Sequence, residues 1–275
     1  MDSVMADDSP TKIDALTNKT VDGLGIDDLV EDLFGINIRG LKTIWTLIRR
    51  PWLYFEAAKT PKWQDQYTPS IRIWFAIFAI GTFFQFVWIG ENSPMYLQYV
   101  DMMTVISTEA NVTLAKNGEM IDMNLFDPNE PAKILVKYSQ LFLPLGYVIC
   151  MLIVAALFHS WGERLSFVVR LRNIFAIIIP GSILGFLFAM ATIKVPADIF
   201  QYVNLGGVLL MMISYFLVAY FGPFREMAGG VRLGRSIGIT ALIIVAVLIA
   251  SVISIILAFF PTILTGFPEP VPLVK

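Results

Sequence analysis

Few side chains in this chain have the types and spacing that catalysis or metal binding requires. The single histidine, His159, has one nearby carboxylate, Glu163, and the two share a helical face only if a helix continues between them. Asp122, Asp127 and Glu130 could bind a cation, but their spacing matches no calcium loop. The sequence therefore predicts no catalytic site, no metal site and no cofactor, and the protein is expected not to be an enzyme.

The composition is that of a membrane protein. Of the 275 residues, 56% are hydrophobic and 15% are charged, against about a quarter charged in an average soluble domain. The one cysteine, Cys150, lies inside an apolar stretch, so the sequence predicts neither disulfides nor a thiol metal site. Residues 1–32 are acidic and polar and lack the apolar core of a cleavable signal peptide. The first membrane span is expected to act as the targeting signal.

Five apolar stretches define the elements that must carry any site: residues 73–90, 141–160, 174–193, 205–222 and 237–260. Each is close to the roughly 20 residues that an α-helix needs to cross a bilayer. None of the five stretches contains Asp, Glu, Lys or Arg, and Lys194 directly follows the third. The predicted fold class is all-α: a polytopic bundle of five transmembrane helices over residues 73–262, preceded by an N-terminal amphipathic interfacial arm.

The basic residues are segregated along the chain. Fifteen of the 20 Lys and Arg fall in residues 1–72, in the second-to-third linker and in the fourth-to-fifth linker, and five fall elsewhere. The positive-inside rule places the fifteen in the cytoplasm. The N-terminus is then cytoplasmic and the C-terminal tail, residues 263–275, lies outside, as an odd number of spans requires.

The segment before the first span divides into parts of opposite charge. Residues 1–25 are predicted to be a disordered acidic tail. Residues 26–34 are predicted to form a short acidic amphipathic helix, which either rests on the protein's own membrane domain or docks a partner. These belong, with the basic segment that follows, to the cytoplasmic side of the membrane.

A basic aromatic segment lies nearest to the bilayer. Its first helix is expected to place Leu41, Ile44, Trp45, Leu47 and Ile48 on one face, and Pro51 starts a second helix. Aromatic rings interleaved with basic groups are typical of a membrane-interface anchor that meets anionic lipids, rather than of a nucleic-acid site. The expected anchor residues are Trp45, Arg49, Arg50, Trp52, Tyr54, Phe55 and Trp63.

Small residues mark close helix approaches. Gly181 and Gly185 form a GxxxG pattern in the third span, and Ala246, Ala250 and Ser254 recur every four residues in the fifth. We interpret both stripes first as packing within one chain and second as contacts between copies. A carrier or channel would instead use uncharged polar groups at mid-membrane, and Pro180, Ser214 and Ser251 are the candidates.

The outer loop, residues 91–140, is the largest segment predicted on the far side. Residues 94–116 are expected to form a helix with a methionine-rich face, which either caps the bundle or receives a partner. A second helix over residues 132–139 would continue into the second span, with Asn129 as its cap and Pro131 in its first turn. The face of the first helix is formed by Met95, Tyr99, Met102, Met103, Ile106 and Ala110.

The segment from Leu47 to Phe55 (LIRRPWLYF), followed by Trp63 and the Tyr67-Thr-Pro69 turn and then by five spans, resembles the bacterial Yip1-domain membrane proteins. These carry a similar arginine-proline and phenylalanine element just before their first span. The resemblance covers about residues 39 to 262 and implies a five-helix integral membrane fold. It implies no catalytic residues.

The function expected from the sequence is that of a non-enzymatic organising or accessory subunit of a membrane protein complex. The expected location is the bacterial inner membrane, and the expected partners are anionic lipids at the cytoplasmic face and other membrane subunits, with no nucleic acid. The alternative is a carrier or channel for a small solute or a lipid.

Overall fold

A computed structural model describes residues 38–60, 63–84, 94–117, 119–120, 126–158, 165–192, 194–267 and 271–272. The acidic tail, the acidic helix at 26–34, Asp122, and the pair His159 and Glu163 lie outside the described residues. The elements in chain order are α3 (Ile38–Arg49), α4 (Pro51–Ala57), α5 (Trp63–Gln66), α6 (Ser70–Phe84), α7 (Pro94–Ala115), β1 (Glu119–Met120), α8 (Asn129–Leu157), α9 (Phe167–Ala191), α10 (Ala197–Phe221), α11 (Gly229–Gly266) and β2 (Val271–Pro272).

Four of the described helices are long enough and apolar enough to cross a membrane: α8, α9, most of α10, and α11. They contain the second to fifth apolar stretches of the sequence. The stretch at 73–90 corresponds to α6, which is apolar but is described over only 15 residues, up to Phe84. The all-helical, multi-pass character of the fold is thereby confirmed, with four spans among the described residues.

Helix α9 is the centre of the bundle. Every residue from Asn173 to Gly181 is buried, including an apolar run from Ile174 to Ile179. A helix segment that is apolar on all sides is stable only when neighbours surround it. Here α3, α6, α8 and α10 all contact α9, and the Trp74 ring of α6 packs edge-on against Phe175, with centroids 5.4 Å apart.

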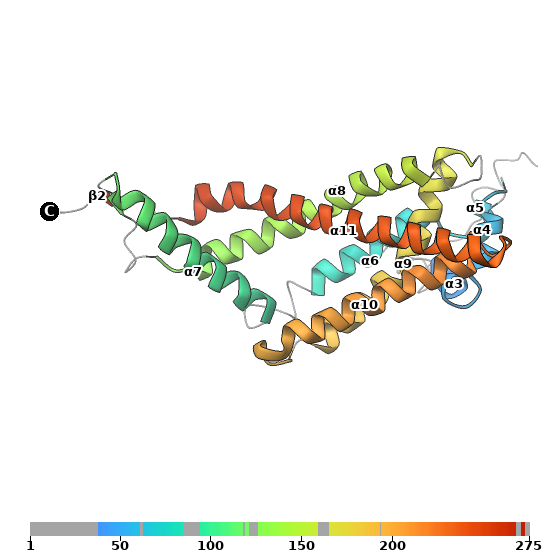
Figure 1. The fold of residues 1–275 in the computed structure, drawn as a ribbon, viewed down its shortest axis with the longest axis horizontal. Coiled ribbons are helices and arrows are strands. Elements are labelled where there is room, and N and C mark those ends of the chain that lie inside the picture. The colour runs from blue at the N-terminus through green and yellow to red at the C-terminus, as the bar shows by residue number, and fades with distance from the viewer. Residues whose placement is uncertain are drawn as a thin grey trace, which may run out of the picture.

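Helices α8 and α11 form the most extensive helix–helix contact among the described elements and extend past α9 and α10 at the end where α7 lies (Figure 1). At 1.5 Å per residue, the 38 residues of α11 measure roughly 57 Å, well beyond a hydrocarbon core of about 30 Å. Small residues permit this pairing, because a Cβ at Gly146 of α8 would lie only 3.1 Å from the Ala250 carbonyl oxygen of α11. The pair is therefore longer than a single crossing requires, and its far end together with α7 is called the outer extension below.

That outer extension has a core of its own. Tyr96 and Met103 of α7 pack with Ala132 and Leu135 of α8 and with Ala258 of α11. The helix predicted at 94–116 is confirmed, and most of its expected apolar face lies against this core. The strand β1 pairs antiparallel with β2, which ties the loop after α7 to the C-terminal tail.

The start of α8 differs in detail from the sequence prediction. The helix begins at Asn129, with Pro131 in its first turn as expected, but the capping side chain is that of Asp127 rather than Asn129. The Asp127 carboxylate accepts hydrogen bonds from the Asn129 backbone N–H (2.9 Å) and side-chain amide (2.8 Å). The pKa of Asp127 is lowered, chiefly by the hydrogen bond from the Asn129 backbone N–H and next by that from the Asn129 side chain. A charged acceptor at this place also complements the positive end of the helix dipole.

Candidate functional site at the basic end of the bundle

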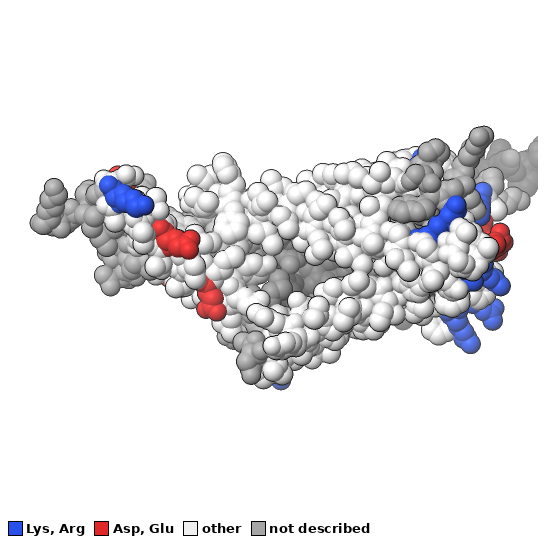
Figure 2. Space-filling model, in the orientation of Figure 1, with Lys and Arg blue, Asp and Glu red and all other residues white. Residues whose placement is uncertain are grey.

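Basic side chains from distant parts of the sequence gather at the end of the bundle that carries α3 to α5. Figure 2 shows Lys and Arg concentrated at this end, with acidic side chains on α7 at the other. The segments that meet here are α3 to α5, the start of α9 and the linker between α10 and α11, as the contacts below show. The charge segregation in the sequence is therefore also a segregation in space.

Two of these arginines cap helices. The Arg170 guanidinium donates from Nη1 to the carbonyl oxygens of Ala155 (2.9 Å) and Ala156 (3.2 Å), in the last turn of α8. Arg232 donates from Nε to the Tyr220 carbonyl oxygen (2.7 Å), in the last turn of α10, and lies over the Tyr220 ring at 3.7 Å. The last carbonyls of a helix lack intrahelical partners and carry its negative dipole end. Each arginine thus belongs to the helix that follows in the sequence and caps the C-terminal end of the preceding helix.

The basic aromatic segment has an inner face that belongs to the protein core. Leu47 of α3 and Tyr54 and Phe55 of α4 are at most 2% exposed, and Trp63 of α5 is 3% exposed. The prediction that Tyr54, Phe55 and Trp63 stand at the membrane interface is therefore corrected: these rings lie inside the protein. The sequence could not distinguish these two locations, because aromatic rings suit both a membrane interface and a protein core.

Close contacts fix this inner face to the bundle. A Cβ at Gly222, at the end of α10, would overlap the Phe55 ring. The Thr68 backbone N–H donates to the Thr43 Oγ1 (3.0 Å), and the Ser70 hydroxyl donates to the Arg172 carbonyl oxygen (2.7 Å). Burial also raises the pKa of the Tyr54 hydroxyl. The segment is an integral part of the fold rather than a loosely attached arm.

Two of the predicted anchor tryptophans are partners of arginines from the bundle linkers. The Arg225 guanidinium lies over the half-buried Trp52 ring at 4.4 Å, and the Arg172 guanidinium lies over the Trp63 ring at 4.1 Å. Such contacts are worth roughly 0.5–2 kcal/mol each. They join α4 to the linker between α10 and α11, and α5 to the first part of α9.

The outer face of α3 has the opposite character. Ile38, Leu41, Trp45 and Ile48 are 54–60% exposed and are spaced three and four residues apart, which places them on one helical face. Trp45 has the Arg49 guanidinium 5.6 Å from its ring centre, and Arg50 is exposed beside it. The single apolar face expected at 41–48 is thus divided, since Leu47 points inwards while Leu41, Trp45 and Ile48 remain outside.

The small-residue stripes are placed at contacts within the chain. A Cβ at Gly181 would overlap the Tyr215 ring of α10, and one at Gly185 would reach the Met211 side chain of α10. In α11, Ala246, Ala250 and Ser254 are all buried, and Ala250 faces Gly146 of α8. The intramolecular interpretation accounts for the burial of both stripes.

The transport candidates do not form one site in the described structure. Pro180 is buried in the packed centre of α9, and the Ser251 hydroxyl bonds back to the Val247 carbonyl oxygen of its own helix. Ser182 and Tyr215 border an intramembrane cavity. Pro180, Ser214 and Ser251 do not line it. Among the described residues, no group of three or more His, Cys, Asp or Glu side chains could hold a metal ion.

Four apolar spans, together with uncharged helix contacts between them, define the class of the molecule. It is a multi-pass integral membrane protein. Comparison of this membrane protein with family models, with curated proteins and with solved structures finds no match.

Sequence reasoning missed the two capping arginines and the division of α3 into two faces. The only signal for either was the three- and four-residue spacing of Leu41, Trp45 and Ile48.

Proposed function

We propose that this membrane protein is a non-enzymatic organising or accessory subunit that spans the bilayer five times, with α6 and the residues after it as the first span. The N-terminus is cytoplasmic and the C-terminus lies on the other side, in the periplasm if the membrane is a bacterial inner membrane. The gathering of basic side chains at the α3 end supports this orientation.

The observation that carries the proposal is the extension formed by α7 with the ends of α8 and α11 (Figure 1). It has a hydrophobic core of its own, and we place it outside the bilayer. The small-residue stripes are used in packing within the chain, so they offer little surface to a partner. On α7, by contrast, Val105 and Val112 are 56% and 62% exposed. We place the contact with another membrane subunit there.

On the cytoplasmic side, the outer face of α3 provides the lipid anchor. Its exposed apolar residues enter the headgroup region, and Arg49 and Arg50 meet anionic lipid at about 1 kcal/mol each. The inner face, buried in the bundle, transmits this attachment to the spans. The architecture proposed here is the one implied by the resemblance to Yip1-domain proteins, and the Arg50-Pro51 element supports it by starting the helix that buries Tyr54 and Phe55.

The partner is tested by extracting the full-length protein from its native membrane in mild detergent and determining what stays bound. Val112→Lys places a charge on the exposed face of α7, and Tyr202→Lys does the same on α10, where Tyr202 is 77% exposed. A stoichiometric partner that the wild type and Tyr202→Lys retain, and that Val112→Lys loses, supports the proposal. A homogeneous protein that carries only lipid contradicts it.

The anchor is tested by hydrogen exchange in nanodiscs that contain anionic lipid. Trp45→Ala with Arg49→Gln and Arg50→Gln is expected to reduce the protection of α3 amides while the spans keep theirs. Substitution is preferable to deletion of the segment, because its inner face belongs to the core. Unchanged lipid-dependent protection of α3 in this variant would show that its outer face is not an anchor.

A further inference from the structure

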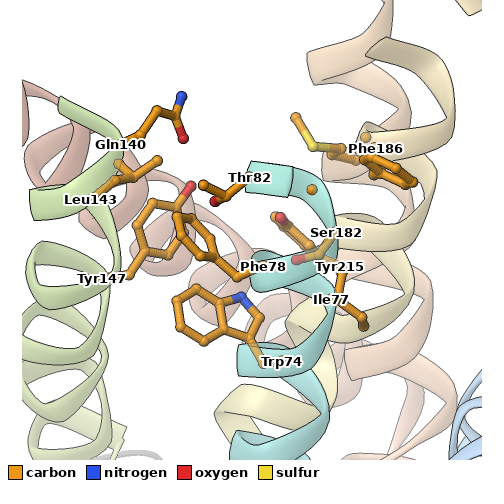
Figure 3. Close-up of a pocket in the computed structure, with 13 residues that line it drawn as sticks. Trp74, Ile77, Phe78, Thr82, Gln140, Leu143, Tyr147, Ser182, Phe186 and Tyr215 are labelled. Carbon is orange, nitrogen blue, oxygen red and sulfur yellow. The ribbon is translucent and has the colours of Figure 1, made fainter. Parts of the chain in front are cut away.

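A cavity of about 280 Å³ lies within the membrane-spanning region, between α6, α8, α9 and α10 (Figure 3). Aromatic side chains form much of its wall: Trp74, Phe78, Tyr147, Phe186 and Tyr215. The Trp74 and Tyr147 rings are stacked with their centres 5.5 Å apart, and Phe78 lies 5.6 Å from Trp74. The cavity belongs neither to the basic end of the bundle nor to the outer extension.

Uncharged polar groups interrupt this wall. Gln140, Thr82 and Ser182 line the cavity, and in Figure 3 Thr82 and Tyr147 face the same space between α6 and α8. No Asp, Glu, Lys or Arg is among the lining residues that the structure describes. Since an ion inside the hydrocarbon region is costly without a compensating charge, the wall favours an uncharged ligand.

The Thr82 hydroxyl supplies the sharpest indication of a ligand. Its Oγ1 is buried and has no hydrogen-bond partner among the described residues. Helical threonines usually bond back to the carbonyl four residues earlier, as Thr192 and Thr262 do here at 2.9 and 2.7 Å. A buried hydroxyl without a partner destabilises the folded state, because its desolvation is not compensated. Thr82 is also one of the residues that line the cavity, so a ligand oxygen in the cavity is the acceptor that we assign to its hydroxyl.

The size of the cavity limits the ligand. An apolar cavity of about 150 Å³ holds one benzene ring, so 280 Å³ accommodates a single substituted ring and the start of a chain, but not a fused polycyclic molecule. The stacked aromatic wall suits a flat ring. The Thr82 hydroxyl and the Gln140 amide are donors that suit a carbonyl oxygen.

We propose that this cavity binds an uncharged, lipid-soluble molecule whose head is one planar ring bearing a carbonyl oxygen, the chemical class of the benzoquinones. The ring lies against Trp74 and Tyr147, its carbonyl accepts from the Thr82 hydroxyl, and its chain leaves towards the lipid. The proposal concerns binding alone and does not depend on the accessory function proposed above.

The test uses the full-length protein in nanodiscs of neutral lipid, titrated with 2-decyl-1,4-benzoquinone while the midpoint of thermal unfolding is measured. A ligand that binds only the folded state raises this midpoint, and the rise continues logarithmically once the ligand concentration exceeds its Kd. Thr82→Val, which removes the donor at nearly constant volume, is expected to weaken apparent binding roughly two- to tenfold. Gly81→Leu is expected to abolish it, because a Cβ there meets only Phe186, at 3.6 Å, and the longer side chain fills the cavity.

The matched control is Thr240→Val. Thr240 is also a buried threonine of a span whose hydroxyl has no partner among the described residues, but it does not line the cavity. Its substitution should leave binding unchanged. Three results would overturn the proposal: no rise in the unfolding midpoint of the wild type, an equal rise with 1-decanol, or equal binding by the Thr82 and Thr240 variants. If Gly81→Leu does not fold, the two threonine variants decide alone.

Discussion

The contact between α9 and α10 predicts that the same substitution, glycine to alanine, has opposite effects at two positions. At Gly181 the new methyl group would overlap the Tyr215 ring, whereas at Gly206 of α10 nothing lies within 4 Å of it. Both changes bring the same gain in helix propensity, up to about 1 kcal/mol. Only Gly181→Ala adds the cost of overpacking, about 1–3 kcal/mol.

The magnitude follows from the difference between the two variants, in which the propensity gain cancels. Gly206→Ala should raise the free energy of unfolding by up to about 1 kcal/mol, and Gly181→Ala should lie about 1–3 kcal/mol below it. Gly185→Ala should fall between them, because its new methyl group meets the Met211 sulfur, and a flexible methionine moves aside more readily than a ring.

The assay is equilibrium unfolding of the purified protein in mixed micelles with increasing denaturing detergent, together with its oligomeric state. A second set of measurements combines Gly181→Ala with Tyr215→Val. The smaller side chain should relieve the overlap, so the two changes should couple rather than add. Equal stability of the Gly181 and Gly206 variants would refute the packing argument. A Gly181 variant that dissociates into smaller species without losing stability would show that the stripe joins copies of the chain.

Three further predictions concern the ends of the helices and the core. Arg232→Gln should lower the free energy of unfolding by about 1–3 kcal/mol, since it removes a charged hydrogen bond to the Tyr220 carbonyl. Arg225→Gln should cost less, because the Arg225 guanidinium lies over the Trp52 ring and makes no side-chain hydrogen bond within the part of the chain that the structure describes. Thermal melts of the two variants check this. For Asp127, a lowered pKa means that the cap is fully effective above the unfolded-state pKa, about 3.9, and is lost as pH falls through the folded-state value. The protection factor of amides at the start of α8, which is the intrinsic exchange rate divided by the measured one, should therefore be constant from about pH 8 to 5 and fall only in stronger acid. In Asp127→Asn this acid-dependent fall should be absent. Cys150, 4% exposed, should resist a membrane-permeant maleimide in the folded protein and react after denaturation, and rapid labelling of the native protein would contradict its placement in the core.

Much of the architecture followed from the sequence because the bilayer imposes simple rules. A chain in hydrocarbon must satisfy its backbone hydrogen bonds within each segment, so apolar stretches of about 20 residues predict helices. The helix at 94–116 and the long helix from 129 were predictable for a similar reason, since Pro94, Asp127 and Asn117 mark their ends. The sequence also identified Gly181, Gly185 and Ala250 as close-approach positions.

The direction in which each side chain points was decided by tertiary structure. Tyr54, Phe55 and Trp63 suit a membrane interface as well as a core, and only the packing of α4 and α5 against the bundle placed them inside. The exposed stripe of α3 remained outside because Thr43 and Leu47 took the inner face. Arg170 and Arg232 obey the charge rule in the sequence, but their role as caps depends on helices that end beside them in space.

The amino-acid sequence by itself determined that this is a helical membrane protein, where its spans lie and which linkers are basic. These properties depend on composition along the chain. Tertiary structure alone decided the two faces of α3, the outer extension with its separate core, and the cavity in which Gln140, Thr82, Ser182 and Tyr147 meet. Those residues come from three different helices, and uncharged polar side chains at such separations leave no periodic signal in the sequence.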